Sequence, residues 1–324
     1  PVQGRDALHG AQVLPEPVFR LDPRLRDHRG RVQSDGDQHV HQPADRDHRR
    51  RGAASAVRHL ELGAAHGRRL EGVRGGLLKG RKGINLPLVD IRAPSLTEKD
   101  LADLDFALTE GVEYTALSFV RRAEDVVDLK GRVGNRALVV AKIEKVQALR
   151  AIEEILPETD AVMVARGDLG VELPFERVPL AQKRIIQLSN FYARPVITAT
   201  QMLESMIEHA RPTRAEASDV ANAILDGTDA VMLSGETAVG KYPLNALQAL
   251  VSIGTEIERS GFLERGPRYL AHPGLHSRGG ASPREHAVAA ATVDAVRRVN
   301  APAIIVLTKS GFSARLVTSY RPTV

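Results

Sequence analysis

The sequence predicts an α/β fold in which parallel strands alternate with helices. The strand-like segments are short, continuous apolar runs, which is typical of strands buried on both faces of a parallel sheet. Each run is followed by a segment with helical periodicity. Polar residues gather where the apolar runs end. Units of this size fit a (β/α)8 TIM barrel or a doubly wound sheet, and the polar strand ends favour the barrel, whose sites lie at the C-terminal ends of several strands.

The predicted elements begin near residue 96. Thr97 is suited to be a helix N-cap, and Asp100 three residues later completes a pattern close to a capping box. This first helix is predicted to continue to Gly111. Five strands then alternate with helices: the strands are predicted at 114–119, 138–144, 160–165, 195–199 and 229–233, and the helices at 125–132, 146–156, 180–193, 214–225 and 243–258.

A second, smaller α/β unit is predicted after the barrel units. Residues 262–283 are rich in Gly, Pro, Ser and His, and we interpret them as a linker. A helix at 284–299, a strand at 303–308 and a helix from Ser313 follow. A lone strand between two helices is too small to be a complete domain, so 284–324 is expected to be the truncated start of one.

Length and composition exclude several classes of protein. The 324 residues suit one large domain or two ordinary ones, and the absence of cysteine excludes a disulfide framework and thiolate chemistry. No apolar run approaches the ~20 residues of a membrane span, and the first residues lack the apolar region of a signal peptide. We therefore expect a cytoplasmic protein with no membrane partner.

The N-terminal segment, residues 1–74, is set apart by its composition. Residues 1–78 contain no Lys, Ile, Thr, Asn, Met or Tyr, but they carry seven of the 11 His and Arg clusters such as the one at 48–51. The missing types mostly have A/T-rich codons, so one interpretation is a segment translated out of frame from a GC-rich gene. A disordered Arg-rich arm is the second. The third is nucleic-acid binding, but no interleaved aromatic residues or known motif support it, and we expect no such partner.

The strand at 138–144 ends in a lysine and a carboxylate. Lys142 and Glu144 are two residues apart, so their side chains point the same way from the strand. Placing a cation and an anion at the end of an apolar strand costs desolvation energy. Either the two residues form a structural ion pair, or they belong to a site that holds a metal ion and a phosphoryl group.

Two further strand ends carry candidate site residues. Asp168 lies in the segment 166–170, where glycines allow a tight turn whose free N–H groups could bind an anion; the alternative is an ordinary strand-to-helix turn. Two carboxylates and a lysine on adjacent strand ends fit Mg²⁺ held by oxygen ligands beside a phosphoryl group. Thr200 ends the next strand, where a β-branched residue is also simply a good strand former.

These residues stand in blocks that resemble the pyruvate kinase family. The resemblance runs from about Gly75 to Gly261, which defines a partial barrel domain at 75–261. The matching blocks, in order, are Lys82–Pro87, Leu96–Asp100, Ser118–Arg121, Ala141–Glu144, Met163–Gly170, Ala199–Met206, Arg211–Glu216 and Met232–Thr237. Residues 304–311 resemble the opening of the family's C-terminal domain. The resemblance implies phosphoryl transfer from phosphoenolpyruvate to ADP in glycolysis, giving pyruvate and ATP.

The resemblance also implies roles for single residues. Lys142 would be the catalytic lysine that neutralises charge on the transferring phosphoryl group. Thr200 would lie beside the methylene carbon at which the enolate is protonated. Glu144 and Asp168 would bind Mg²⁺ or Mn²⁺. The residues implied in substrate binding are Ser118, Ala165, Arg166, Gly167, Asp168 and Thr200.

The chain also departs from the family's pattern. The family's first three barrel strands supply an arginine to the phosphate and four ligands to K⁺, and none of those motifs occurs in residues 1–78. We therefore expect about five of the eight βα units, and a K⁺ requirement whose ligands are absent here. The family further implies a homotetramer. Two hypotheses follow: a pyruvate kinase, or an inactive fragment or pseudoenzyme that keeps at most Mg²⁺ or ligand binding. We expect this chain as written to form little or no pyruvate.

Overall fold

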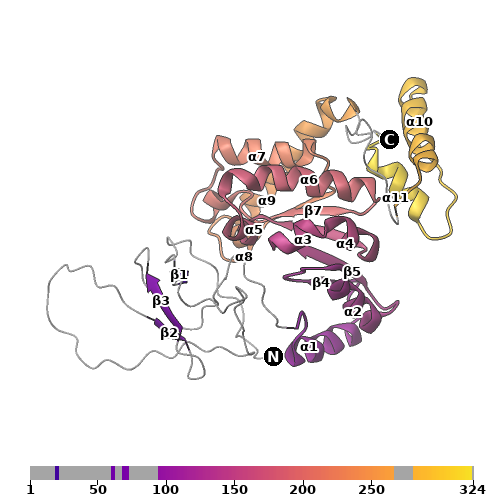
Figure 1. Cartoon of the computed structure of the whole chain (residues 1–324). Helices are drawn as coiled ribbons and strands as arrows, with labels where there is room; N and C mark the ends of the chain where they lie inside the picture. Colours follow the sequence, from indigo (N-terminus) through magenta and orange to yellow (C-terminus); the bar gives the residue numbers. More distant parts are fainter. Residues whose placement is uncertain (1–18, 22–59, 63–67, 73–93, 266–279, 323–324) are drawn as a thin grey trace. The chain divides into compact units, whose positions relative to one another are not determined.

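The computed structural model describes residues 19–21, 60–62, 68–72, 94–265 and 280–322. The chain divides into two compact units, Pro1–Pro94 and Ser95–Val324 (Figure 1). In the first unit, three short strands form an antiparallel sheet in the order β1-β3-β2: β1 (Phe19–Leu21), β2 (Leu60–Leu62) and β3 (Arg68–Gly72). Most of the segment 1–74 lies outside the described residues, so the interpretations of its origin stay predictions.

A five-stranded parallel sheet forms the centre of the second unit (Figure 1). Its strands are β4 (Tyr114–Leu117), β5 (Leu138–Ile143), β6 (Ala161–Ala165), β7 (Val196–Ala199) and β8 (Ala230–Met232). Their order in the sheet is their order in the sequence, without the reversal that defines a doubly wound sheet. The predicted alternation is therefore confirmed, and the sheet is part of a (β/α)8 barrel.

Helices connect the strands and cover the sheet. The α-helices of this part are α1 (Glu98–Thr109), α2 (Ala123–Val133), α3 (Val146–Arg150), α4 (Ile152–Glu158), α5 (Arg166–Glu172), α6 (Val178–Phe191), α7 (Arg214–Leu225), α8 (Gly235–Ala238) and α9 (Pro243–Arg259). Short 3₁₀ turns lie at η2 (Phe175–Arg177), η3 (Glu204–Ile207) and η4 (Phe262–Arg265). Capping boxes at Thr97 and Thr213 fix the starts of α1 and α7.

Two expectations about these helices were wrong in detail. The single helix expected at 146–156 is interrupted at Ala151, so it forms α3 and α4. The segment 166–170, expected to be a tight turn, is the first part of α5, which starts directly where β6 ends. The two glycines therefore lie inside a helix, where tertiary contacts outweigh their low helix propensity.

The main core lies between one face of the sheet and the helices. Its buried members include Val139, Ala141 and Ile143 of β5, Val162 and Val164 of β6, Ile155 of α4 and Ile185 of α6. The alternate residues of the strands point to the opposite face, where Val140, Ala161, Met163 and Ala199 form a smaller cluster. Lys142 is in register with Met163, so the candidate site residues of β5 project from that opposite face.

The C-terminal segment folds back onto the barrel helices. Helices α10 (Pro283–Val299) and α11 (Phe312–Ser319) pack against each other, and α11 also contacts α6. The ring of His286 stacks on Phe191 with centroids 4.5 Å apart. The helices were predicted, but the strand expected at 303–308 does not form. A strand needs a hydrogen-bonding neighbour, and none of the described strands lies beside these residues. Ile305 and Leu307 are accordingly 91% and 94% exposed.

Part of the predicted linker, residues 266–279, lies outside the described residues. The domain boundaries expected at 74/75, 261/262 and 283/284 stay predictions. Within the described part of the chain, no helix is long and apolar enough to cross a membrane.

The core assignment predicts a large difference between two isoleucines. Ile155 is fully buried between α4 and the sheet, whereas Ile305 is 91% exposed. Ile155→Ala should lower the free energy of unfolding by about 2–5 kcal/mol, because it leaves a cavity in the main core. The matched change Ile305→Ala should stay within about 0.5 kcal/mol of the parent. Urea unfolding of the two variants measures both values, and equal losses would contradict the assignment.

Candidate active site

Lys142 and Glu144 form a buried ion pair at the C-terminal end of β5. Lys142 Nζ lies 2.6 Å from Glu144 Oε1, and the exposed fractions of the two side chains are 24% and 1%. The lysine also donates a 2.9 Å hydrogen bond to Ser118 Oγ, at the end of the neighbouring strand β4. The parallel register explains this contact, because it pairs Leu117 with Ala141 and so sets the next residues side by side.

Glu144 is held from the other side by the backbone after β4. The N–H of Phe119 donates a 2.7 Å hydrogen bond to Glu144 Oε2. Phe119 has a φ of 55°, which is uncommon for a bulky residue, so the chain is bent to bring this N–H to the carboxylate. Glu144 Oε1 is buried and accepts no hydrogen bond from the described residues, although Lys142 Nζ is close. One oxygen of this carboxylate is therefore fixed by the backbone, and the other is buried with Lys142 Nζ as its ion-pair partner.

Asp168 lies in the first turn of α5, directly beyond β6. Its side chain is half-buried and has no hydrogen bond or ion pair with another described residue. The described part of the chain holds no group of three or more His, Cys, Asp or Glu that could bind a metal by itself. Mg²⁺ is usually held by one or two carboxylates together with substrate oxygens and water. Glu144, whose Oε1 would exchange Lys142 for the ion, and the unpartnered Asp168 fit that type of site.

Thr200 caps the adjacent strand β7 and contacts the start of α5. Its hydroxyl accepts a 2.7 Å hydrogen bond from the N–H of Gly167 and donates one of 2.7 Å to the carbonyl of Ala199. A substrate carboxylate bound by the Gly167 N–H would have to replace the Thr200 hydroxyl there. Thr200 and Gln201 have φ values of 67° and 53°, a left-handed conformation that costs a β-branched residue energy.

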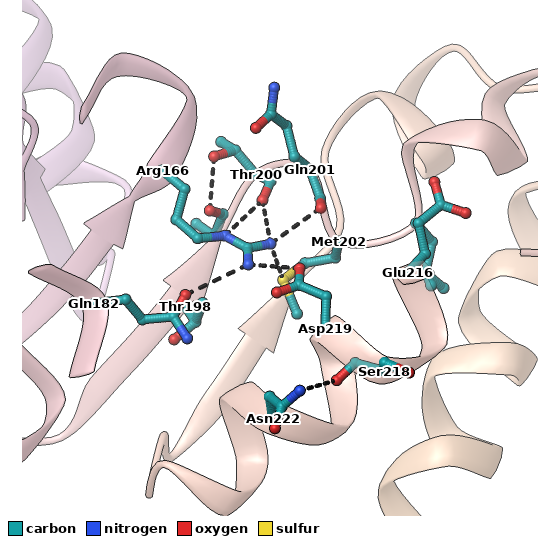
Figure 2. Close-up of polar contacts among 12 residues, drawn as sticks. Arg166, Gln182, Thr198, Thr200, Gln201, Met202, Glu216, Ser218, Asp219 and Asn222 are labelled. Atoms are coloured by element: carbon teal, nitrogen blue, oxygen red, sulfur yellow. Dashed lines mark hydrogen bonds and ion pairs between the residues drawn. The ribbon is translucent and has the colours of Figure 1, made fainter. Parts of the chain in front are cut away.

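The side chain of Arg166 holds this strained backbone (Figure 2). Its Nη2 donates to the carbonyls of Thr200 and Gln201, at 2.7 and 3.0 Å, and Nε also donates to Thr200. Nη1 forms a 2.6 Å ion pair with Asp219 of α7 and reaches Gln182 of α6 at 3.4 Å. Arg166 is buried, and its guanidinium is fully engaged. Only its backbone remains free to contribute to the substrate cradle that the family resemblance implies.

Two further carboxylates fix the segment after Thr200. Glu236, fully buried after β8, accepts hydrogen bonds from the N–H groups of Leu203 and Ser234 at 3.0 and 2.7 Å. Glu216, the capping-box residue of α7, accepts from the N–H and hydroxyl of both Ser205 and Thr213. The loop that carries Thr200 is thus bound to the ends of β6 and β8 and to α7.

Two acidic groups near this loop, Glu204 of η3 and Glu216 of α7, have opposite pKa shifts. Burial raises the pKa of Glu204, and the negative charges of Glu236 and Glu216 add to that effect. Burial alone would also raise the pKa of Glu216. The hydrogen bonds from Ser205 and Thr213 outweigh burial, so the pKa of Glu216 lies below its ordinary value.

The structure brings most of the predicted residues together in two contact groups, but Asp168 makes no hydrogen bond or ion pair with either group. Ser118, Lys142 and Glu144 form one, and Ala199, Thr200, Arg166 and Gly167 form the other, with Ala165 as the last residue of β6. The sequence reasoning missed Phe119, which acts through its backbone N–H, and Gln182 and Asp219, which come from separate elements with no local motif. The arginine directly after the apolar run 161–165 was a usable signal, since a charge in such a place requires partners.

Two family models match the chain. The family model described as "Pyruvate kinase, barrel domain" matches residues 59–247, and "Pyruvate kinase, alpha/beta domain" matches residues 286–324. The first match starts before Gly75, so it includes residues in which we expected no resemblance.

Three relatives illustrate the similarity. The chain is 50% identical to "Pyruvate kinase" of Mycobacterium tuberculosis over 246 residues, which are 75% of this chain and 50% of that protein. It is 50% identical to "Pyruvate kinase" of Corynebacterium glutamicum over 250 residues (76% and 50%) and 47% identical to "Pyruvate kinase PKLR" of Rattus norvegicus over 251 residues (76% and 43%). The chain spans about half the length of the curated relatives it matches.

Arg166 is predicted to be essential for the stability of the Thr200 loop. Arg166→Met should lower the free energy of unfolding by about 3–5 kcal/mol, because it leaves the backbone carbonyls and Asp219 without their cation. The control is Arg132→Met, which breaks an ion pair with Asp128 whose side chains are 45% and 48% exposed. That change should cost no more than about 1 kcal/mol in the same urea titration. Similar losses in the two variants would refute the assignment.

Glu216 is predicted to make stability depend on pH in the acid range. Its folded-state pKa is lowered, so its contribution is complete above its unfolded pKa of about 4.5 and is lost as pH falls through the folded value. The difference in unfolding free energy between the parent and Glu216→Gln should therefore be constant near neutrality and shrink at acid pH. Ser205→Ala, which removes one donor, should reduce this pH dependence. A difference that does not change on acidification would contradict the prediction.

Proposed function

This chain belongs to the pyruvate kinase family, and we propose that its site transfers a phosphoryl group from phosphoenolpyruvate to ADP, giving pyruvate and ATP. The observation that carries the proposal is the cluster at the end of β5, where Lys142 pairs with a buried carboxylate and also contacts Ser118. Phosphoryl transfer depends mainly on positioning and on neutralising charge, and this cluster is suited to both.

Lys142 is the proposed catalytic lysine. Its ammonium group is a fixed positive charge that can neutralise negative charge on the transferring phosphoryl group and on the enolate that remains. Its hydrogen bond to Ser118 and its ion pair with Glu144 direct the group to one position at the strand ends. Little reorganisation is then needed when a phosphate approaches.

Glu144 and Asp168 would hold Mg²⁺ or Mn²⁺. When bound, such an ion polarises phosphoryl and enolate oxygens and so stabilises their negative charge. The chain's own contribution is to present two carboxylates from adjacent strand ends, one of them fixed by the N–H of Phe119. K⁺ is part of the proposal through family membership, but we assign no residue of this chain to it.

The substrate would lie between Lys142 and the start of α5. We propose that the backbone of Ala165, Arg166 and Gly167 receives its carboxylate, and that Ser118 and Asp168 line the same pocket. Thr200 would stand beside the methylene carbon and orient the proton that converts the enolate into pyruvate. Its hydroxyl links α5 to β7 and would leave the Gly167 N–H when the carboxylate binds there, while keeping its hydrogen bond to Ala199.

Family membership also suggests the wider setting. We propose glycolysis as the pathway, the cytoplasm as the location and a homotetramer as the assembly. The hypothesis of an inactive family member is not favoured, because relatives that are about 50% identical are named pyruvate kinase. The side chains of Lys142, Glu144, Asp168 and Thr200 are all chemically able to perform the proposed roles.

Lys142→Met tests the proposal. Calorimetric titration with phosphoenolpyruvate and Mg²⁺ should show binding to the parent and at least about tenfold weaker binding to the variant. A coupled assay for pyruvate, run with excess protein, should show that any rate of the parent falls about 10²–10³-fold, the usual cost of losing one electrostatic stabiliser.

The control variant is Lys99→Met, at an exposed surface pair with Asp103. It should behave as the parent in both measurements, and thermal unfolding checks that each variant is folded. A folded parent that binds neither phosphoenolpyruvate nor a divalent cation would overturn the proposed function. So would a Lys142→Met variant with parental binding and rate.

A further inference from the structure

A second buried ion pair lies beside the candidate site. Lys145 Nζ is 2.6 Å from Glu172 Oε1, and the two side chains are 13% and 2% exposed. The other oxygen, Glu172 Oε2, is buried and has no hydrogen-bond partner in the described part of the chain. Burying a pair so completely carries a large desolvation cost, and replacing such pairs by apolar residues is often neutral or stabilising. Stability alone is therefore a weak reason for this pair.

The two residues come from the same elements as the proposed metal ligands. Lys145 directly follows Glu144 at the end of β5. Glu172 lies in α5, four residues after Asp168, so the two acidic side chains share one face of the helix. The Lys145–Glu172 pair therefore turns the face of α5 that carries Asp168 toward the end of β5 that carries Glu144.

Phe119 connects this pair to Glu144 itself. Lys145 Nζ lies 5.4 Å from the centre of the Phe119 ring, within range of a cation–π contact. The N–H of the same residue donates the hydrogen bond that fixes Glu144. Lys145 thus contacts both the residue that orients Glu144 and the helix that carries Asp168.

We propose that Lys145 and Glu172 are positioning residues that set the separation of Glu144 and Asp168, and thereby the affinity of the site for a divalent cation. The inference rests on the proposed function, because it takes these two carboxylates as the metal ligands. Neither residue of the pair needs to touch the ion. Some residues hydrogen-bond to metal ligands and orient them without touching the ion. Replacing such a residue commonly lowers metal affinity by about 10–100-fold.

The test must distinguish an effect of the site's net charge from an effect of the position of the two carboxylates. Lys142 and Lys145, with Glu144, Asp168 and Glu172, leave the site with one net negative charge. Removing only Lys145 or only Glu172 changes that charge and hence the attraction for a cation. The double variant Lys145→Met/Glu172→Gln removes the ion pair and keeps the net charge, so a change in affinity reports on position.

The experiment measures Mn²⁺ binding to the full chain by electron paramagnetic resonance, without substrate. We expect the double variant to bind Mn²⁺ at least about tenfold more weakly than the parent. Lys145→Arg keeps the charge and a donor for Glu172, and it should retain most of the parental affinity. Glu172→Asp, which shortens the pair by one methylene, should weaken binding by an intermediate factor, and it serves if the double variant does not fold.

The matched control is Lys99→Met/Asp103→Asn, which removes a pair whose side chains are 81% and 62% exposed. It should leave the Mn²⁺ affinity unchanged. A folded double variant, or Glu172→Asp in its place, that binds Mn²⁺ within twofold of the parent would overturn the inference alone. Parental binding that survives Asp168→Asn, or a parent that binds no Mn²⁺, would instead overturn the proposed metal ligands and the inference with them.

Discussion

The in-order parallel pairing of β4 to β7 is the constraint on which the rest of the site depends. Parallel strands all end at one edge of the sheet, and here successive strands are also neighbours. Residues in register share a face: Lys142 pairs with Met163, and two residues further along β6 Ala165 pairs with Ala199, so these residues and Ser118 lie on the face away from the main core. A shift of one residue in any pairing would turn the corresponding side chain into the core.

At the same edge of the sheet, Arg166 stabilises the backbone at Thr200 and Gln201. Its buried guanidinium replaces water as the partner of the Thr200 and Gln201 carbonyls, and Asp219 balances its charge. These contacts offset the cost of the left-handed conformation at Thr200, which in turn places a hydroxyl against the Gly167 N–H. The side chain of Arg166, two residues before the proposed metal ligand Asp168, is therefore engaged in holding the structure.

The parts of the fold set by local patterns could be predicted from the sequence. Apolar runs gave the strands, capping residues such as Thr213 gave helix starts, and strand ends gave Lys142 and Glu144. Features that depend on distant partners could not be predicted. The strand at 303–308 fails because the described residues offer it no neighbouring strand, and the positive φ of Thr200 follows from Arg166 on another strand end. The roles of the site residues depend on ligands and remain predictions.

The two ion pairs of the site resolve the same physical problem in different ways. A carboxylate as buried as Glu144 or Glu172 is costly without a counter-ion, so each has a lysine at 2.6 Å. Lys145 and Glu172 are both nearly inaccessible, which suits a permanent link between β5 and α5. Lys142 is more exposed and keeps Ser118 as a second partner, so it can move away from Glu144 Oε1 when another cation takes that place. On the proposed function, that release would free the ammonium group for a phosphoryl oxygen, while Lys145 and Phe119 keep Glu144 and α5 in position.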